Sequence, residues 1–584
     1  MTARMWVDLG AEIPMRDGTV LRADVYRAEG DHPLPVLVHQ PYQGRRAKES
    51  LAVLVNPVTA FDRGYATVLV DARGTGGSDG AWQPFAGQDA DGYDTVEWCA
   101  AQPWCDGGVG VYGSSGMGVT ALRTAIAAPP HLRAAMLAFT GGTYHDGWAY
   151  TSGVLELSWA QWWARVMGAG RLARMPAGAE RDALAERLDR ARDLWPSVRR
   201  LPLAGGPVPA ELAPWYHDWL DHHGYDGYWA SVDSAAQAHR IRVPVLQVGG
   251  YHDPFMPGQL AVGHALTSHP DPFVRENSRS VLGPWTHSSY MSNATTFTGS
   301  RNWGPAADSS WRTMTPLLLD WFDRWMKEPG ERPAAEPRVR YFVMGEGAWR
   351  TSDTWPPPAT PLTLYLRGGG AANGASGDGV LSTVDPAPDE PGDSFRYDPL
   401  DPVPTRGGAT LAPVELGGEG IQDQTPIEER HDVLVYTSPV LSAPVLVAGR
   451  VTLTLYAASS AVDTDFTAKL VDVEPGGFRA NISEGIVRAR HRAGFDHDEL
   501  IEPGRVYELT VRLFDVAHSF GAGHRIRLEV SSSNFPRFAR NLNSAVHPHA
   551  AGPDDVVVAV QQIFHNSAHP SHLALPVLPA AQPD

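Results

Sequence analysis

The chain lacks the features that disulfide-linked, membrane-spanning and nucleic-acid-binding proteins require. Only two of its 584 residues are cysteines, Cys99 and Cys105, which excludes a disulfide framework and argues against a metal site built on them. No run approaches the roughly 18 apolar residues of a membrane-spanning helix, and no apolar stretch follows a basic start. Lysine and arginine number 48 against 66 aspartates and glutamates, without a dense basic block. We therefore expect a soluble, cytoplasmic protein that binds neither nucleic acid nor membranes.

The first half of the chain alternates short apolar strands with segments of helical spacing. This alternation predicts parallel strands in a doubly wound α/β sheet, with ligands at the carboxyl ends of the strands. A hairpin around Asp17 and Gly18 comes first. The further segments are expected strands at 35–39, 65–71, 134–141, 241–249 and 278–283, a strand–turn–helix at 109–128, and helices at 50–63, 89–102 and 310–326.

Composition divides the chain into three regions. Residues 1–144 and 240–354 are predicted to form the α/β core, with 338–344 leading out of it. Residues 145–239 have helical spacing and many tryptophans, which predicts an inserted helical cap. In residues 355–584, short β-branched segments alternate with Gly- and Pro-rich turns, which predicts a jelly-roll β-sandwich.

An apolar strand enters the string GSSGMG and leaves it as a helix, the arrangement of a nucleophile elbow. The amides of that helix can stabilise an oxyanion at the turn. Ser114 and Ser115 are both candidate nucleophiles, because the strict G-x-S-x-G motif is absent. Ser115 is preferred because it lies further past the strand, with Gly113, Gly116 and Gly118 around it. The alternative is a loop without chemistry; a phosphate loop would need a lysine or the G-x-G-x-x-G spacing.

Two later strands end in titratable residues. A serine nucleophile needs a general base, and an imidazole base needs a carboxylate on its other nitrogen. Ser115, Asp253 and His287 follow one another in the order Ser, Asp, His that α/β hydrolases use. His252 is a rival base, but adjacent residues point apart, so we assign it to the substrate pocket. Because the chain has 22 histidines, a chance match to this order is easy, and the alternative is that Asp253 and His287 are ordinary turn or cap residues.

Seven strings spread over all three regions carry a family resemblance: PVLVHQPYQ, DARGTGGSDG, EWCAAQPWCDGGVGVYGSSGMG, LGPWTHS, YFVMGEGAW, SSAVDTDFTAKLVDV and SSSNFPRFARN. With them the chain resembles, from end to end, the CocE/NonD hydrolases, the cocaine esterase-like family related to X-prolyl dipeptidyl peptidases. The resemblance implies an α/β hydrolase core, a helical cap and a jelly-roll domain, with a triad of Ser115, Asp253 and His287. It also implies an oxyanion hole formed by the Tyr42 hydroxyl and the Gly116 amide.

Departures from the family pattern concern the substrate. Gly116 stands where the family often has tyrosine, and His252 and Pro254 flank the aspartate where cocaine esterase-like members have tyrosine and glycine. We therefore expect the same chemistry in a remodelled pocket.

The acyl group is expected to bind where cap and core meet. The resemblance places Trp148 at a pocket tryptophan and Phe255 just past the catalytic aspartate, so both are predicted walls. Trp162 and Trp163 are candidates for further walls, although cap tryptophans also pack helix on helix. An apolar pocket of this kind favours aromatic or branched acyl groups.

The leading hypothesis is a serine esterase that acts on a small-molecule ester without a cofactor or metal. The second is an amide hydrolase of the same family: a β-lactam acylase, an α-amino-acid ester hydrolase or an X-Pro dipeptidyl peptidase. Such an enzyme would bind an ammonium group through carboxylates, and Asp146 and Glu156 are the candidates. The third is a non-catalytic binder, which a fluorophosphonate probe would not label. The oligomeric state stays open, a homo-oligomer included.

Overall fold

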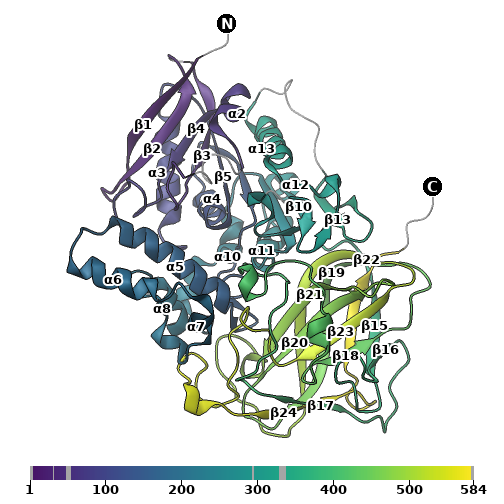
Figure 1. Ribbon diagram of the computed structural model, residues 1–584. Coiled ribbons are helices and arrows are strands. Elements are labelled where there is room, and N and C mark those ends of the chain that lie inside the picture. The colour runs from purple at the N-terminus through teal and green to yellow at the C-terminus, as the bar shows by residue number, and fades with distance from the viewer. Residues whose placement is uncertain (1–3, 31, 48–53, 293–294, 328–336, 580–584) are drawn as a thin grey trace.

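The computed structural model describes residues 4–579 except 31, 48–53, 293–294 and 328–336. Figure 1 shows an α/β structure in the N-terminal half, a group of helices from α5 to α8 beside it, and a β-rich body formed by the C-terminal residues. The predicted fold class, a doubly wound α/β core with a helical insertion and a C-terminal β-sandwich, is confirmed.

One ten-stranded sheet forms the centre of the N-terminal part, in the order β1-β2-β4-β3-β5-β6-β9-β10-β13-β14. From β4 to β13 along this order every pairing is parallel, and antiparallel pairings lie at both edges. The strands are β1 (Met5–Pro14), β2 (Val20–Ala28), β3 (Leu34–His39), β4 (Ala66–Val70), β5 (Cys105–Ser114), β6 (Leu132–Ala138), β9 (Val245–His252), β10 (Arg279–Thr286), β13 (Val339–Val343) and β14 (Ala348–Ser352).

Helices cover both faces of this sheet because successive strand residues point to opposite sides. Val36 and Val38 belong to the core that also contains residues of α3, α4 and α11, whereas Leu37 belongs to the core with residues of α2 and α13. The helices are α2 (Pro57–Asp62), α3 (Gln88–Ala100), α4 (Ser115–Ala127), α11 (Met256–Thr267), α12 (Pro272–Asn277) and α13 (Trp311–Met326).

Two expectations differ from the observed elements. The helix expected at 50–63 begins only at Pro57, because the side chain of Asn56 caps it by accepting from the Val58 amide; residues 50–53 lie outside the described part. The segment 338–344, expected to lead out of the core, instead adds β13 to the sheet beside β10.

The chain between β6 and β9 forms the helical insertion. Its core is rich in aromatic residues, and the short hairpin of β7 (Tyr150–Thr151) and β8 (Val154–Leu155) precedes the helices. The helices are α5 (Leu157–Arg174), α6 (Ala179–Asp189), α7 (Leu194–Arg199), α8 (Pro214–Asp221), α9 (Gly227–Val232) and α10 (Ser234–Gln237).

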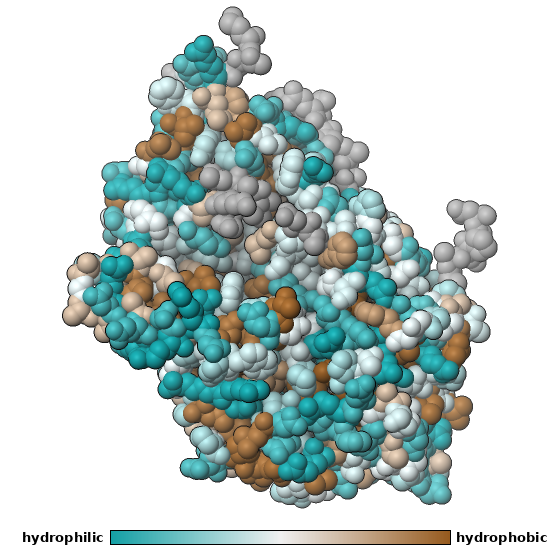
Figure 2. All heavy atoms as spheres, in the orientation of Figure 1, coloured by the Kyte–Doolittle hydropathy of each residue, from teal (hydrophilic) through white to brown (hydrophobic). Residues whose placement is uncertain are grey.

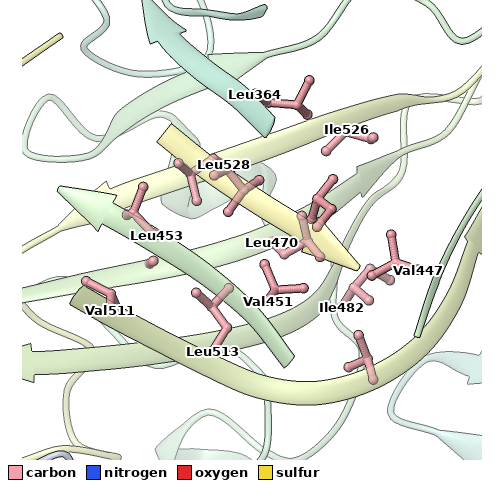
Figure 3. Close-up of a cluster of buried hydrophobic side chains, with 14 of the residues drawn as sticks. Leu364, Val447, Val451, Leu453, Leu470, Ile482, Val511, Leu513, Ile526 and Leu528 are labelled. Carbon is pink, nitrogen blue, oxygen red and sulfur yellow. The ribbon is translucent and has the colours of Figure 1, made fainter. Parts of the chain in front are cut away.

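The C-terminal body is a network of eleven strands around one aliphatic core. Figure 3 shows Leu453, Leu470, Leu513 and Leu528, from four strands, meeting in this core. The strands are β15 (Thr360–Arg367), β16 (Val380–Ser382), β17 (Asp393–Tyr397), β18 (Leu434–Thr437), β19 (Val445–Ser459), β20 (Asp465–Val473), β21 (Arg479–Arg488), β22 (Tyr507–Phe520), β23 (Arg525–Ser531), β24 (Ala559–Phe564) and β25 (His572–Val577). In the sequence, β11 (Phe297–Thr298) and β12 (Arg301–Asn302) lie between β10 and β13 and form a two-stranded sheet of their own, and α14 (Thr425–Glu428) precedes β18.

Among the described residues, no helix combines the length and the apolar character that crossing a membrane requires. Figure 2 shows hydrophilic residues spread over the visible face between smaller hydrophobic groups.

Candidate active site

A strained turn joins β5 to α4 and carries the candidate nucleophile. Ser115 has φ +56°, in the left-handed region that costs a residue with a side chain about 1–3 kcal/mol unless the surroundings hold it. A Cβ at Gly113 would lie 2.2 Å from the carbonyl oxygen of Met117, so the turn closes only over a glycine. Ser114, by contrast, has ordinary extended backbone angles. The strain is therefore concentrated on Ser115.

Hydrogen bonds join the three predicted triad residues. His287 Nε2 lies 3.1 Å from Ser115 Oγ, and His287 Nδ1 lies 3.0 Å from Asp253 Oδ2. Because a carboxylate only accepts, Nδ1 carries the proton and Nε2 accepts from the serine hydroxyl. The amide of Phe255 donates to the other carboxylate oxygen at 2.8 Å. This arrangement can remove the proton from Ser115 as its oxygen attacks an acyl carbon.

His252 lies on another side of the site. It is 1% exposed, its Nε2 has no hydrogen-bond partner among the described residues, and burial lowers its pKa to about 3. His518 and Arg537 of the β-rich body contribute to this lowered pKa. The sequence analysis expected His252 in the substrate pocket, but His252 is not among the residues that line the cavity beside Ser115.

Tyr42 packs directly against Gly116, the two residues implied for the oxyanion hole. A Cβ at position 116 would lie 2.3 Å from Cε1 and 2.9 Å from the hydroxyl oxygen of Tyr42, so glycine makes this approach feasible. Trp163 meets the Tyr42 ring edge-on at 6.2 Å. Burial raises the pKa of Tyr42, which keeps the phenol protonated and able to donate a hydrogen bond.

If Tyr42 donates to the oxyanion, Tyr42→Phe should lower kcat by about 100-fold or more, because one donor to the transition state is lost while the ring stays. Steady-state kinetics on an ester substrate measure this. Tyr290→Phe is the control, since it removes a hydroxyl from the same cavity and should change kcat only a few-fold. A change in KM alone for Tyr42→Phe would mean that the residue only packs.

A cavity of about 420 Å³ opens beside Ser115 and His287. Its size suits a small ligand. All three parts of the chain contribute to its wall, which includes Tyr42, Met117, Trp159, Trp162, Trp163, Val166, Tyr290, Leu411, Ala412 and Glu419. A second cavity, of about 470 Å³, lies on the other side of Tyr42 and Gln43 and is also lined by Arg171, Arg174 and Trp215. The geometry therefore offers space on two sides of the candidate oxyanion donor.

Of the four predicted aromatic walls, Trp162 and Trp163 line the cavity, whereas Trp148 and Phe255 lie behind it. Trp148 is 1% exposed and stacks on Phe255 with 3.8 Å between ring centroids. The Phe255 ring meets His287 at 4.9 Å with perpendicular planes. Phe255 directly precedes α11, and its ring is fully buried beside the catalytic histidine. These two residues therefore support the site and do not form its wall.

The carboxylates expected to bind an ammonium group are occupied elsewhere. Glu156 is 2% exposed, accepts from Arg537 Nη2 at 3.2 Å and accepts from Thr151 at 2.8 Å. Arg537 also pairs with Glu484 within the β-rich body. The Arg537–Glu156 ion pair therefore joins the insertion to that body. Asp146 accepts from the Ser152 amide at 2.7 Å. Neither carboxylate lines the cavity beside Ser115.

Glu419 is a carboxylate of this cavity that the sequence did not single out. It lies on a loop of the C-terminal part, and Ser288 donates to it through its hydroxyl at 2.8 Å and its amide at 3.3 Å. Within the described chain its carboxylate forms no salt bridge with a lysine, arginine or histidine. Burial raises its pKa, and the hydrogen bonds from Ser288 and Thr286 and the nearby His287 partly oppose that rise. No local motif marks it, because it reaches the site only through the packing of the β-rich body.

Comparisons with known proteins match both halves of the chain. Residues 17–289 match the model of X-Pro dipeptidyl-peptidase (S15 family), and residues 333–574 match the X-Pro dipeptidyl-peptidase C-terminal non-catalytic domain. The chain is 37% identical over 575 residues to cocaine esterase of Rhodococcus sp. (strain MB1 Bresler), covering 97% of each. Among solved structures, an α-amino acid ester hydrolase has a TM-score of 0.81 at 23% identity, covering 99% of this chain and 97% of that one. An aminopeptidase from a Thaumarchaeota archaeon has the same TM-score and coverage at 24% identity.

Proposed function

The chain belongs to the X-Pro dipeptidyl-peptidase (S15) family, and on this premise we propose that it is a serine hydrolase that cleaves carboxylic esters through an acyl-enzyme. The observation that carries the proposal is the chain of hydrogen bonds from Asp253 through His287 to Ser115 beside an apolar cavity. The 37% identity to a protein named cocaine esterase supports ester hydrolysis. The substrate of that relative is not assigned to this chain, since Gly116, which packs against Tyr42 at the site, stands where the family often has tyrosine.

The reaction proceeds in two halves. Ser115 Oγ attacks the ester carbonyl while His287 Nε2 takes its proton, and Asp253 stabilises the imidazolium. Tyr42 and the Gly116 amide donate to the oxyanion of the tetrahedral intermediate. Its collapse breaks the bond to the alcohol oxygen, which receives the proton from His287, and leaves an acyl group on Ser115. Water, deprotonated by His287, then releases the carboxylic acid and frees the serine.

Three tryptophans of α5 favour a bulky or aromatic acyl group. Trp159, Trp162 and Trp163 line the cavity beside Ser115, and burial of apolar surface against such rings gives most of the binding free energy in sites of this kind. A panel of p-nitrophenyl esters tests the proposal: kcat/KM for the benzoate should exceed that for the acetate. A protein that hydrolyses no member of the panel and does not react with a fluorophosphonate would be a binder.

A second function, hydrolysis of α-amino-acid esters or amides, is favoured by one observation. Glu419 gives the cavity a carboxylate that is not paired with a cation of the described chain. A substrate ammonium group near it would stabilise the ionised form, whereas burial alone favours the protonated form. Since the pKa of Glu419 is raised, this binding should strengthen as pH rises through that pKa.

Glu419→Gln distinguishes the two functions. If the cavity accepts a cationic acyl group, the variant should lower kcat/KM for a phenylglycine ester by about tenfold and leave the benzoate ester nearly unchanged, because only the charge is removed. Both esters are measured on both proteins across a pH series. Equal losses for the two esters would show that Glu419 only positions Ser288 and that the neutral-ester function stands alone.

A further inference from the structure

Three side chains from distant parts of the sequence meet where the helical insertion contacts the β-rich body. His223 follows α8, Asp498 lies between β21 and β22, and His547 lies between β23 and β24. One nitrogen or oxygen atom from each lies within 4.8 Å of the other two. His223 Nε2 is 3.7 Å from Asp498 Oδ1, and the two histidine rings are 3.7 Å apart between centroids. We refer to these three residues as the interface cluster.

The backbone that carries the interface cluster is fixed by contacts across the interface. The amide of Tyr225 donates to the carbonyl of Phe495 at 2.6 Å, which joins the segment after α8 to the loop of Asp498. His549 Nδ1 lies 3.0 Å from the carbonyl oxygen of Leu220, which joins α8 to the loop of His547. The three side chains are therefore held close together by the fold.

Neighbouring side chains orient the carboxylate. His491 Nε2 lies 2.8 Å from Asp498 Oδ1, and its Nδ1 lies 3.2 Å from the carbonyl oxygen of Gly153. Arg490 donates to Asp498 Oδ2 at 3.0 Å and pairs with Asp463 as well, which offsets its charge. Hydrogen bonds of this kind orient carboxylate ligands in metal sites.

We propose that the interface cluster binds a divalent transition-metal ion, with zinc the best fit. Two imidazole nitrogens and one carboxylate oxygen are zinc ligands, and water can complete a tetrahedral set. With bonds of about 2.0–2.2 Å, tetrahedral ligand atoms lie about 3.3 Å apart, so small side-chain rotations would close the observed spacing. Asp498 is exposed and both histidines are half-buried, which permits such rotations and access from solvent. Calcium and magnesium prefer oxygen ligands throughout.

The bound ion would tie the segment after α8 to two loops of the β-rich body. It would therefore stabilise the docking of the helical insertion and take no part in the chemistry at Ser115, whose cavity shares no residue with the cluster. Because an ion that binds only the folded state raises its stability, zinc should raise the midpoint of thermal unfolding.

The full-length chain, treated with EDTA and exchanged into metal-free buffer, is the starting material. Titration with zinc against a chromophoric chelator should show one tight equivalent, and zinc but not magnesium should raise the unfolding midpoint. His547→Ala should weaken binding at least tenfold and remove the shift. The matched control is His222→Ala, because His222 pairs with Asp226 at 2.6 Å on the same segment and belongs to no such cluster among the residues that the structure describes.

His223→Ala is a second ligand variant in case His547→Ala does not fold, and retained ester hydrolysis shows that either variant has folded. The proposal is overturned if the wild-type protein binds no equivalent of zinc more tightly than both ligand variants do. It is equally overturned if His222→Ala loses as much affinity as they do, since binding would then be adventitious to surface histidines.

Discussion

Ser115→Ala should reduce ester turnover by at least about 10⁴-fold, the largest effect expected of any single substitution in this chain. Without the hydroxyl no acyl-enzyme can form, and the residual rate would come from binding and the oxyanion donors alone. The protein should also lose covalent labelling by a fluorophosphonate, which intact-mass spectrometry measures. Folding should be preserved, because the substitution by alanine removes one oxygen atom and leaves the packing around the turn unchanged.

Ser114→Ala is the matched control for this prediction. Ser114 is the last residue of β5, is 1% exposed and has extended backbone angles. It lines the same cavity, but the hydrogen bond from the serine hydroxyl to His287 Nε2 is made by Ser115. The variant should keep turnover within a few-fold and label fully. If Ser114→Ala were inactive and Ser115→Ala active, the assignment of the nucleophile would be wrong by one residue.

Features encoded by neighbouring residues could be predicted from the sequence. The alternation of apolar strands and helices predicts a layered sheet, and the Gly- and Ser-rich string after β5 predicts a tight turn at Ser115. The ends of β9 and β10 lie on the same edge of a parallel sheet, so residues just past them come together. This is why the structure brings Asp253 and His287 to Ser115 as the sequence analysis expected.

Features that depend on packing between distant segments could not be predicted. Trp148 and Phe255 lie near the site, but the sequence could not show that they stack on each other behind the wall. Glu419 reaches the cavity from more than 100 residues past His287, on a loop without a recognisable motif. The interface cluster likewise joins three loops, so no ligand spacing along the chain marks it.

The β-rich body contributes directly to the cavity, although the model that its sequence matches is described as a non-catalytic domain. Leu411, Ala412 and Glu419 form part of the wall beside Ser115. Arg537 also connects this body to Glu156, directly before α5, which carries the tryptophan wall. A substitution in the C-terminal part can therefore change substrate preference without touching the triad.

His287→Ala should lower kcat by about 10⁴-fold or more, since His287 is the described side chain that hydrogen-bonds to both Ser115 and Asp253. The reason is chemical: the serine hydroxyl is a poor nucleophile until a neutral imidazole accepts its proton. Pre-steady-state kinetics with a p-nitrophenyl ester would show loss of the burst that accompanies acylation, which separates this variant from one that is slow only in deacylation.

His252→Ala provides the contrast, because this histidine neighbours Asp253 in sequence but faces the β-rich body. The variant should lower thermal stability by opening a buried cavity and leave the burst intact.

The pH profile adds an independent test. Histidines ordinarily titrate between pH 5 and 8, and burial lowers the pKa of His252 to about 3, so an acid limb of kcat/KM in that range cannot come from His252. The acid limb should therefore persist unchanged in His252→Ala. If His252→Ala lost the acid limb while His287→Ala stayed active, His252 would be the general base.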